Sequence, residues 1–369
     1  MHEQYPSVVE FVADVPADVR SIAICGTSYS DTGGVARVIE QQALELTRQG
    51  YDVEIHTLTA TTEPPDGVTL YEHGRFETTP YKEIDKLLAP FTPSGWRFLS
   101  RMREMDLVVA HRFPFSVLGS LASLVHGTVY TFWSHPSQAS EDLFDGVAKL
   151  WATLQHHLET RNVAVRRADY LCAVSEDSGA YLESKTGRDV IVVPNSVPDS
   201  RFTSVASRAE IERRFDLDAS ETVVLHVGRL SPRKNVHELI DAFRTVTSDV
   251  DDCTLVLVGK ATMDDYSRTI RERAGDSVRL TGFVDDETLA GLYERSDVYA
   301  TCSLSEGWGL PLSEADRFGT PVVAYDSIPA ATAVEDAFLA ADGDRAAFEE
   351  RLAAAIGRSC DALDPSSRW

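Results

Sequence analysis

Short apolar runs alternate with helical segments along the chain, and this alternation limits the possible folds more than any other feature. In the first half a strand is expected at 21–28 (SIAICGTS), a helix at 35–48, and further strands at 51–59 and 105–112. Continuous apolar strands that alternate with helices are typical of a parallel sheet covered on both faces. We therefore expect this half to be a doubly wound α/β domain.

The pattern continues and then restarts after a segment rich in proline and serine. After a frayed N-terminus, the first half is expected to end with helices at 115–125 and 145–168 and strands at 128–136, 170–176 and 190–198. Pro194–Arg208 is the expected linker, and strands are expected beyond it at 222–230, 253–261, 278–284, 298–303 and 321–327. We predict Rossmann-like domains at 1–200 and 201–369 that face a cleft, with ligands at the carboxyl ends of the strands.

Acidic side chains dominate the composition. The 369 residues contain 58 Asp and Glu against 35 Lys and Arg, which gives a formal net charge of −23. A field of this sign repels nucleic acid phosphates, so no nucleic acid partner is expected. Lysine is scarce, and we interpret the surface as that of a halophilic protein. The alternative is an acidic proteome from a GC-rich genome, and unfolding in low against molar KCl separates the two.

The cysteines and the hydropathy pattern further limit the class of protein. Five cysteines without CxxC spacing, four of them in apolar runs, indicate buried thiols and no disulfide framework or zinc site. No run reaches the roughly 18 apolar residues that span a bilayer, and the N-terminus MHEQYPSVVEF lacks a signal pattern. We expect a cytoplasmic protein.

The stretch VGRLSPRKN (227–235) brings three cations to the end of an expected strand. Arg229, Arg233 and Lys234 follow that strand and precede a helix. Guanidinium groups and helix N–H groups that converge at such a point can bind a phosphate or diphosphate. On composition alone, solvated charges in a connecting loop are an open alternative.

Two carboxylates flank a glycine-rich turn in SEGWGLPLSEA (305–315). Pro311 predicts a helix that begins near Leu312, which would put Glu314 in its first turn, where a carboxylate is favoured in any protein. Glu306 instead lies at the end of an expected strand, at the mouth of the expected cleft. A carboxylate beside an anion site accepts hydrogen bonds from hydroxyl groups, which indicates a sugar or ribose as ligand.

The first half offers two weaker candidates. The turn Asp31–Gly34 presents backbone N–H groups before a helix, but it lacks the full GxGxxG pattern, and many structural turns contain Gly-Gly. His135, in SHP after an expected strand, is either a packed turn residue or a ligand contact. Neither candidate identifies a ligand by itself.

Together these motifs resemble the retaining, family 4 type of GT-B glycosyltransferases. In the second half the matching motifs are VGRLSPRKN, VGK (258–260), LTGFV (280–284), LYERSDVYATCSLSEGWGLPLSEA (292–315) and GTPVVA (319–324). In the first half GGV (33–35), SHP (134–136) and VPNSV (193–197) match more loosely. The resemblance implies a GT-B fold, with the acceptor on the N-terminal domain and a nucleotide-sugar donor on the C-terminal domain.

The resemblance also implies roles for the matching residues. Arg229 and Lys234 would hold the donor diphosphate and stabilise it as it leaves, Glu306 would bind hydroxyls of the donor sugar, and Glu314 would bind the ribose. The other implied donor contacts are His135 at the sugar, Gly33, Gly34, Gly309 and Leu310 at the diphosphate, and the backbone of Gly282, Phe283 and Val284 at the nucleobase.

The implied reaction is transfer of a hexose from a UDP- or GDP-sugar to a glycan or lipid-linked acceptor with retention of configuration. No cofactor and no metal are expected, because preorganised cations can stabilise the leaving diphosphate and no Asp-x-Asp run is placed to chelate an ion. Rival interpretations are a nucleotide-sugar epimerase and a non-catalytic nucleotide-sugar-binding subunit. The short continuation after 321–327 indicates an altered donor-side loop. Only the end of the chain at SSRW, near where a last crossing helix commonly begins, favours the subunit.

A locally basic segment lies within the acidic first half. Residues 82–112 hold six basic and four acidic side chains. Aromatic and basic residues interleave there, namely Phe91, Trp96, Arg97, Phe98, Arg101 and Arg103. Such a patch suits a membrane surface or a lipid phosphate, which would place the protein at the inner face of the membrane. A solvated helix is the alternative, and the oligomeric state is not predicted.

Overall fold

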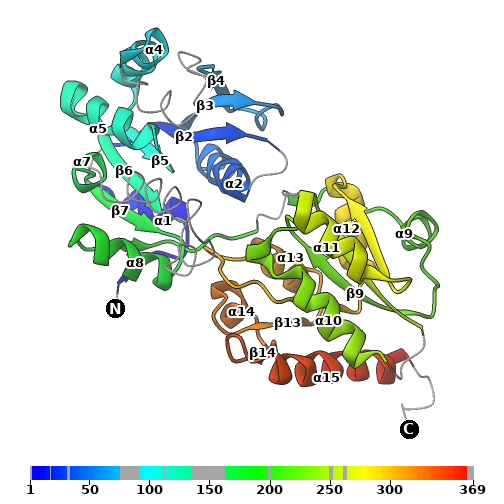
Figure 1. Ribbon diagram of the computed structural model, residues 1–369. Coiled ribbons are helices and arrows are strands. Elements are labelled where there is room, and N and C mark those ends of the chain that lie inside the picture. The colour runs from blue at the N-terminus through cyan, green and yellow to red at the C-terminus, as the bar shows by residue number, and fades with distance from the viewer. Residues whose placement is uncertain are drawn as a thin grey trace. The chain divides into compact units, whose positions relative to one another are not determined.

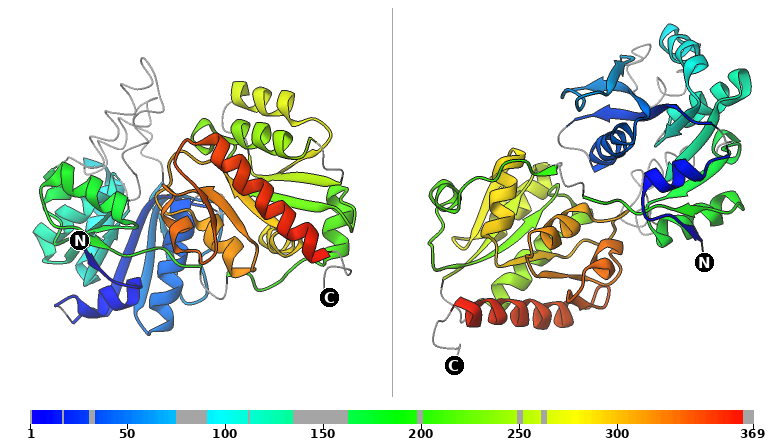
Figure 2. Two further views of the ribbon diagram at one scale, coloured as in Figure 1. Left: turned by 90° about the horizontal axis from the view of Figure 1, so that it is seen from below. Right: turned by 180° about the vertical axis from the view of Figure 1, so that it is seen from behind.

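The computed structural model describes residues 2–16, 18–30, 34–74, 91–111, 113–134, 163–197, 201–248, 252–260 and 264–363. The chain divides into two compact units, Met1–Ser196 and Val197–Trp369. Each unit is a parallel sheet with helices on both faces (Figures 1 and 2). The doubly wound α/β architecture expected from the alternating pattern is therefore confirmed for both halves.

The N-terminal unit is built on a sheet whose described strands run in the order β1-β8-β7-β6-β5-β2-β3-β4, with every pairing parallel. Its described elements are β1 (Glu3–Gln4), α1 (Val8–Asp14), β2 (Ser21–Tyr29), α2 (Gly34–Arg48), β3 (Asp52–Ala60), β4 (Thr69–Glu72), α4 (Pro93–Arg101), η2 (Met102–Glu104), β5 (Leu107–Ala110), α5 (Phe115–His126), β6 (Val129–Ser134), α7 (Val163–Arg166), β7 (Tyr170–Ala173), α8 (Glu176–Thr186) and β8 (Ile191–Val192). Of the helix expected at 145–168, only α7 lies within the described residues.

The expected frayed N-terminus is wrong. β1 pairs in parallel with β8, and α1 follows directly. The Ser7 side chain accepts a hydrogen bond from the backbone N–H of Glu10, which caps the helix. Val8, Phe11 and Val12 then fall on one helical face and are buried in the core. Burial of this apolar face holds the segment in place.

The C-terminal unit has a second parallel sheet, whose described strands run in the order β11-β10-β9-β12-β13-β14. Its described elements are α9 (Arg208–Phe215), β9 (Thr222–Val227), η5 (Pro232–Lys234), α10 (Val236–Val246), β10 (Cys253–Val258), α11 (Asp264–Ala274), β11 (Val278–Gly282), α12 (Asp286–Arg295), β12 (Val298–Thr301), α13 (Leu310–Arg317), β13 (Val322–Tyr325), α14 (Pro329–Ala333), β14 (Phe338–Ala340) and α15 (Arg345–Leu363). The sequence patterns did not predict α9, α14, β14 or α15.

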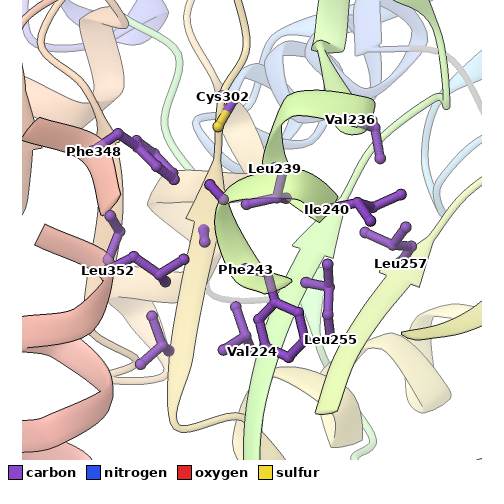
Figure 3. Packing of buried hydrophobic residues seen from close by; sticks show 14 of the residues in the cluster. Val224, Val236, Leu239, Ile240, Phe243, Leu255, Leu257, Cys302, Phe348 and Leu352 are labelled. Atoms are coloured by element: carbon purple, nitrogen blue, oxygen red, sulfur yellow. The ribbon is translucent and has the colours of Figure 1, made fainter. Parts of the chain in front are cut away.

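One face of this second sheet is covered by α10 and α15 (Figure 3). Leu239 and Phe243 on α10 and Phe348 and Leu352 on α15 are fully buried against strand residues such as Leu255. Burial of side chains of this size is the main favourable term in folding. This packing holds β9 and β12 rigidly, and the loops at their carboxyl ends start from these two strands.

The described cysteines are free and buried, as expected: Cys25, Cys172, Cys253 and Cys302. Burial in the apolar core raises the pKa of each of the thiols Cys25, Cys172 and Cys302 well above its ordinary value. These thiols therefore stay protonated and behave as small apolar side chains. Among the described residues, no helix is both long enough and apolar enough to cross a membrane.

Candidate functional site

The candidate site lies where β9 and β12 end. The two strands are parallel neighbours, with Val224 opposite Val298 and Leu225 opposite Tyr299. Their following loops therefore leave the sheet at the same edge, and the backbone N–H of Leu304 donates to the carbonyl oxygen of Arg233 at 3.0 Å. This pairing brings VGRLSPRKN and SEGWGLPLSEA together, although they lie far apart in the sequence.

A buried ion pair joins the two loops. Lys234 Nζ donates to Glu306 Oε1, and both side chains are 9% exposed. Arg233 donates through Nη1 to the carbonyl oxygen of Ser305 and, at 3.3 Å, to Glu306 Oε2. Ser303 Oγ donates to Glu306 Oε1 at 2.6 Å. The Glu306 carboxylate is thus held by two cations and a hydroxyl group.

The charges of this cluster follow from burial and from these contacts. Burial would raise the pKa of Glu306, but Lys234 and Arg233 outweigh burial and lower that pKa to about 2. Burial lowers the pKa of Lys234, and Glu306 opposes that shift. Arg229 is exposed and also acts on Lys234, lowering the same pKa. Lys234 and Arg233 against the one carboxylate of Glu306 leave an excess of positive charge, which suits a phosphate-bearing ligand.

Close backbone packing supports these loops. Gly259, directly after β10, has φ +138°, and a Cβ there would lie 1.9 Å from the carbonyl oxygen of Gly228. Its N–H donates to the carbonyl oxygen of Gly282 at 2.8 Å, at the end of β11. Phe283 follows, 43% exposed, with Lys260 Nζ 5.3 Å from its ring centre, whereas Val284 is buried. Only glycine fits at position 259.

The helix after the glycine-rich turn begins earlier than expected. Gly309, with φ +108°, is the N-cap residue, and α13 begins at Leu310. Glu314 is therefore not in the first turn of the helix, and the expected position is wrong. It is buried, accepts a hydrogen bond from the Tyr293 hydroxyl at 2.8 Å, and lies 3.5 Å from Arg201 Nε. Glu314 thus has fixed partners of its own, separate from the Glu306 cluster.

The predicted site residues of the first half are described only in part. Gly33 and His135 lie outside the described residues, and Gly34 is the first residue of α2. His111 was not among the predicted site residues. It directly follows β5 and is buried, with Nε2 2.8 Å from Gln42 Oε1. The signal was present, because a histidine at the carboxyl end of a central parallel strand is where a ligand contact is expected.

His226 on β9 is fully buried beside the ion pair. Its Nδ1 lies 3.0 Å from the carbonyl oxygen of Ala300, so Nδ1 carries the hydrogen. Burial, reinforced by the charge of Lys234, lowers the pKa of His226 from 6.5 to about 4. Protonation of the unfolded chain therefore removes stability as the pH falls from 6.5 toward 4.

Replacing His226 with asparagine should weaken this acid sensitivity, because the amide can still donate to Ala300 while it does not titrate. Between pH 6.5 and 4 the wild type should lose about 3 kcal/mol more unfolding free energy than His226→Asn. Urea unfolding of both proteins at the two pH values measures this difference. Equal losses in the two proteins would contradict the assignment of a neutral, buried His226.

Within the described ranges, no group of three or more His, Cys, Asp or Glu side chains is placed to hold a metal ion. At the carboxyl ends of β9 and β12 the structure brings together Lys234, Arg233 and Glu306 instead.

Solved structures match both units of the chain. WaaG, a glycosyltransferase involved in lipopolysaccharide biosynthesis, superposes with a TM-score of 0.70 over 94% of each chain at 16% identity. HepE of Anabaena, in complex with UDP and glucose, superposes with a TM-score of 0.68 over 93% of this chain and 94% of that one at 21% identity. The two doubly wound units therefore have the GT-B fold of glycosyltransferases.

Sequence comparison gives the family. The model of the family "Glycosyl transferases group 1" matches residues 207–361, and "Glycosyltransferase Family 4" matches 32–201. The phosphatidyl-myo-inositol mannosyltransferase of Mycobacterium leprae is 31% identical over 350 residues, which are 90% of this chain and 86% of that protein. The D-inositol 3-phosphate glycosyltransferase of Segniliparus rotundus is 29% identical over 80% of this chain and 69% of its own. The chain belongs to the group 1 family of glycosyltransferases.

Proposed function

We propose that the protein transfers a hexose from a UDP- or GDP-sugar to a hydroxyl group of a glycan or glycolipid, with retention of configuration. The observation that supports this most is the buried Lys234–Glu306 pair with Arg233 beside it. Burying an ion pair costs more free energy than it commonly returns, so such a pair is weak as a stabilising device. Binding of a ligand that requires preorganised charge would explain why the buried ion pair is present.

The donor diphosphate is the ligand that matches the charge of this cluster. Arg229 and Lys234 would bind it and stabilise the charge that develops as it leaves, as a preorganised electrostatic site does. Backbone N–H groups of Gly309 and Leu310, at the start of α13, would add to the same site. No resident cofactor or metal ion is part of this proposal.

The hydroxyl groups of the donor would be bound by the carboxylates. Glu306 Oε2 has lone pairs beyond its contact with Arg233, so it can accept from the donor sugar. Glu314, positioned by Tyr293 and Arg201, would accept from the ribose. The backbone of Gly282, Phe283 and Val284 would meet the nucleobase, and Gly33, Gly34 and His135 would contribute from the N-terminal unit. We expect the leaving phosphate oxygen to take the proton of the attacking hydroxyl.

A panel of donors tests the proposal. UDP-glucose, UDP-galactose and GDP-mannose are incubated with the protein alone and with glucose, mannose or D-inositol 3-phosphate, and products are followed by chromatography. The expected result is transfer, or slow release of free sugar, with one donor. Nucleotide binding without turnover would favour the non-catalytic subunit, and interconversion of sugars on the nucleotide would favour the epimerase.

We also propose peripheral association with an anionic membrane through α4 and the residues directly before it. Phe91 and Trp96 are 81% and 67% exposed, and Arg97 and Arg103 are exposed near them. Arg101, grouped with them in the sequence, faces inward instead: it donates to the buried carboxylate of Glu54. Exposed aromatic rings beside cations suit the headgroup region of a bilayer. The named lipid substrate of the mannosyltransferase relative agrees with this proposal.

Vesicle flotation tests the membrane proposal. Wild-type protein should float with phosphatidylserine-containing vesicles, and the double variant Trp96→Ser, Arg97→Ser should float at least several-fold less, because ring insertion and a local charge are both removed. Arg268→Ser, on the surface of α11, is the matched control and should float like the wild type. Wild-type protein that stays at the bottom of the gradient would rule the association out.

A further inference from the structure

A line of hydrogen-bonded titratable side chains runs through the N-terminal unit. Glu54 and His56 lie on β3, both buried, and His73 directly follows β4. Glu54 Oε2 lies 3.0 Å from His56 Nε2, and His56 Nδ1 lies 2.9 Å from His73 Nε2. Carboxylate, imidazole and imidazole are therefore hydrogen-bonded in line.

The inner end of this line of side chains is the negatively charged carboxylate of Glu54. Arg101 Nε donates to both oxygens of Glu54, at 3.0 and 3.2 Å, and its Nη2 donates to Oε1. Burial opposes ionisation of Glu54, but the hydrogen bonds from His56 and Arg101 outweigh burial and lower its pKa. Arg101, which also pairs with Glu104, places a positive charge beside Glu54 and disfavours a second positive charge on His56. Burial lowers the pKa of His56 accordingly.

The ionised carboxylate fixes both tautomers. A carboxylate can only accept, so His56 Nε2 carries the hydrogen, and neutral His56 then has a bare Nδ1. That nitrogen must accept from His73 Nε2, which leaves His73 Nδ1 without a hydrogen when His73 is neutral. Burial, with His56 and Arg97, lowers the pKa of His73 to about 4, so the neutral form prevails near pH 7. Among the residues that the structure describes, none makes a hydrogen bond with His73 Nδ1.

His73, the outer end of this line of side chains, lies at the sheet edge formed by the carboxyl ends of the strands, where ligands of parallel sheets bind. β4 is the outermost described strand beside β3 (Figure 1), and His73 follows its carboxyl end. Phe98 and Phe115 contact the His73 ring, with centroids 5.6 and 6.4 Å away, and hold its plane. His73 is half-buried, and Arg97 is exposed near it.

We propose that His73 binds a hydroxyl group of the acceptor substrate through Nδ1, with Glu54 and His56 as positioning residues that keep that nitrogen free to accept. The inference rests on the proposed glycosyl transfer and assigns the N-terminal unit a polyol contact. An acceptor hydroxyl has a hydrogen to donate, and a bare imidazole nitrogen in a fixed plane selects its orientation.

Two substitutions of His73 separate binding from structure. In His73→Gln the amide can still donate to His56, but the acceptor at the Nδ1 position is lost. In His73→Asn the amide oxygen can take the Nδ1 position, while the link to His56 is lost. With glucose and D-inositol 3-phosphate as acceptors, His73→Gln should raise the acceptor KM about tenfold with donor KM within about twofold, and His73→Asn should raise it less.

The inference is wrong if His73→Gln leaves the acceptor KM unchanged, or if His73→Asn is impaired more than His73→Gln, because a purely structural link to His56 predicts that order. A wild type that neither transfers nor hydrolyses any donor would instead overturn the proposed function. Nitrogen NMR on the full chain labelled at histidine then decides the inference independently: it requires His73 protonated on Nε2 at pH 7, and a hydrogen on Nδ1 would overturn it.

Discussion

Lys234→Ala is expected to lower kcat of glycosyl transfer by about 10²- to 10³-fold, the scale of losing one preorganised group that stabilises developing charge. Lys234 is buried, so its ammonium group is already desolvated and held by Glu306 before the donor binds. No reorganisation of water is then needed when the diphosphate leaves. Initial rates with the donor identified by the panel measure the effect.

The control for this prediction must account for stability. Lys234→Ala leaves Glu306 buried with Arg233 and Ser303 as its remaining partners, and breaking a buried pair costs about 3 to 5 kcal/mol. Thermal unfolding of the variant therefore accompanies the kinetics. Lys185→Ala, on α8 in the other unit, is the matched substitution and should keep wild-type rates. A folded Lys234→Ala protein with more than about a tenth of wild-type kcat would contradict the assigned role.

Glu306→Gln should lower kcat by about 10²-fold while binding of the free nucleoside diphosphate does not weaken. The amide cannot neutralise Lys234 and Arg233, so the cluster becomes more positive and holds the product at least as well. The sugar, however, loses a carboxylate acceptor, and Lys234 loses the partner that positions it. Steady-state kinetics and calorimetric titration with UDP and GDP separate the two effects.

Ser303→Ala is the matched change for Glu306, because it removes one hydrogen bond to Oε1 and no charge. Its kcat should fall by less than about tenfold. If Glu306→Gln turned over the donor at the wild-type rate, Glu306 would be a structural counter-ion, and the assigned sugar contact would be wrong.

Much of the fold follows from local patterns. The buried runs that became β9 and β10 are largely apolar, and Gly50, with φ +90°, marks the end of α2 from the sequence alone. The missed elements also carried local signals. Ser7 and Glu10 fit the capping pattern of α1, and Ser175 and Gly187 cap α8 at its two ends. These signals were outweighed by the lack of a long apolar period.

Less of the candidate site than of the fold could be predicted from the sequence. The strand pattern indicated that Glu306 would lie beside the cations, but the direct pair with Lys234 depends on the adjacency of β9 and β12, which no local pattern encodes. The start of α13 was missed because Gly309, in the left-handed region, is the N-cap, so the helix begins at Leu310, ahead of Pro311. The hydrogen-bonded line from Glu54 to His73 could not be predicted, because it depends on the register between β3 and β4 and on the contact of Arg101 with the buried Glu54.

The anomeric configuration of the first product tests the central claim most directly. Real-time proton NMR of the wild-type protein with UDP-glucose and with GDP-mannose, both α-configured donors, follows the sugar as it is transferred or released. A retaining glycosyltransferase produces the α anomer first, before mutarotation in solution, and the nucleoside diphosphate accumulates in equal amount. A β anomer that forms first, or a nucleotide sugar that is bound and never cleaved, would contradict the account.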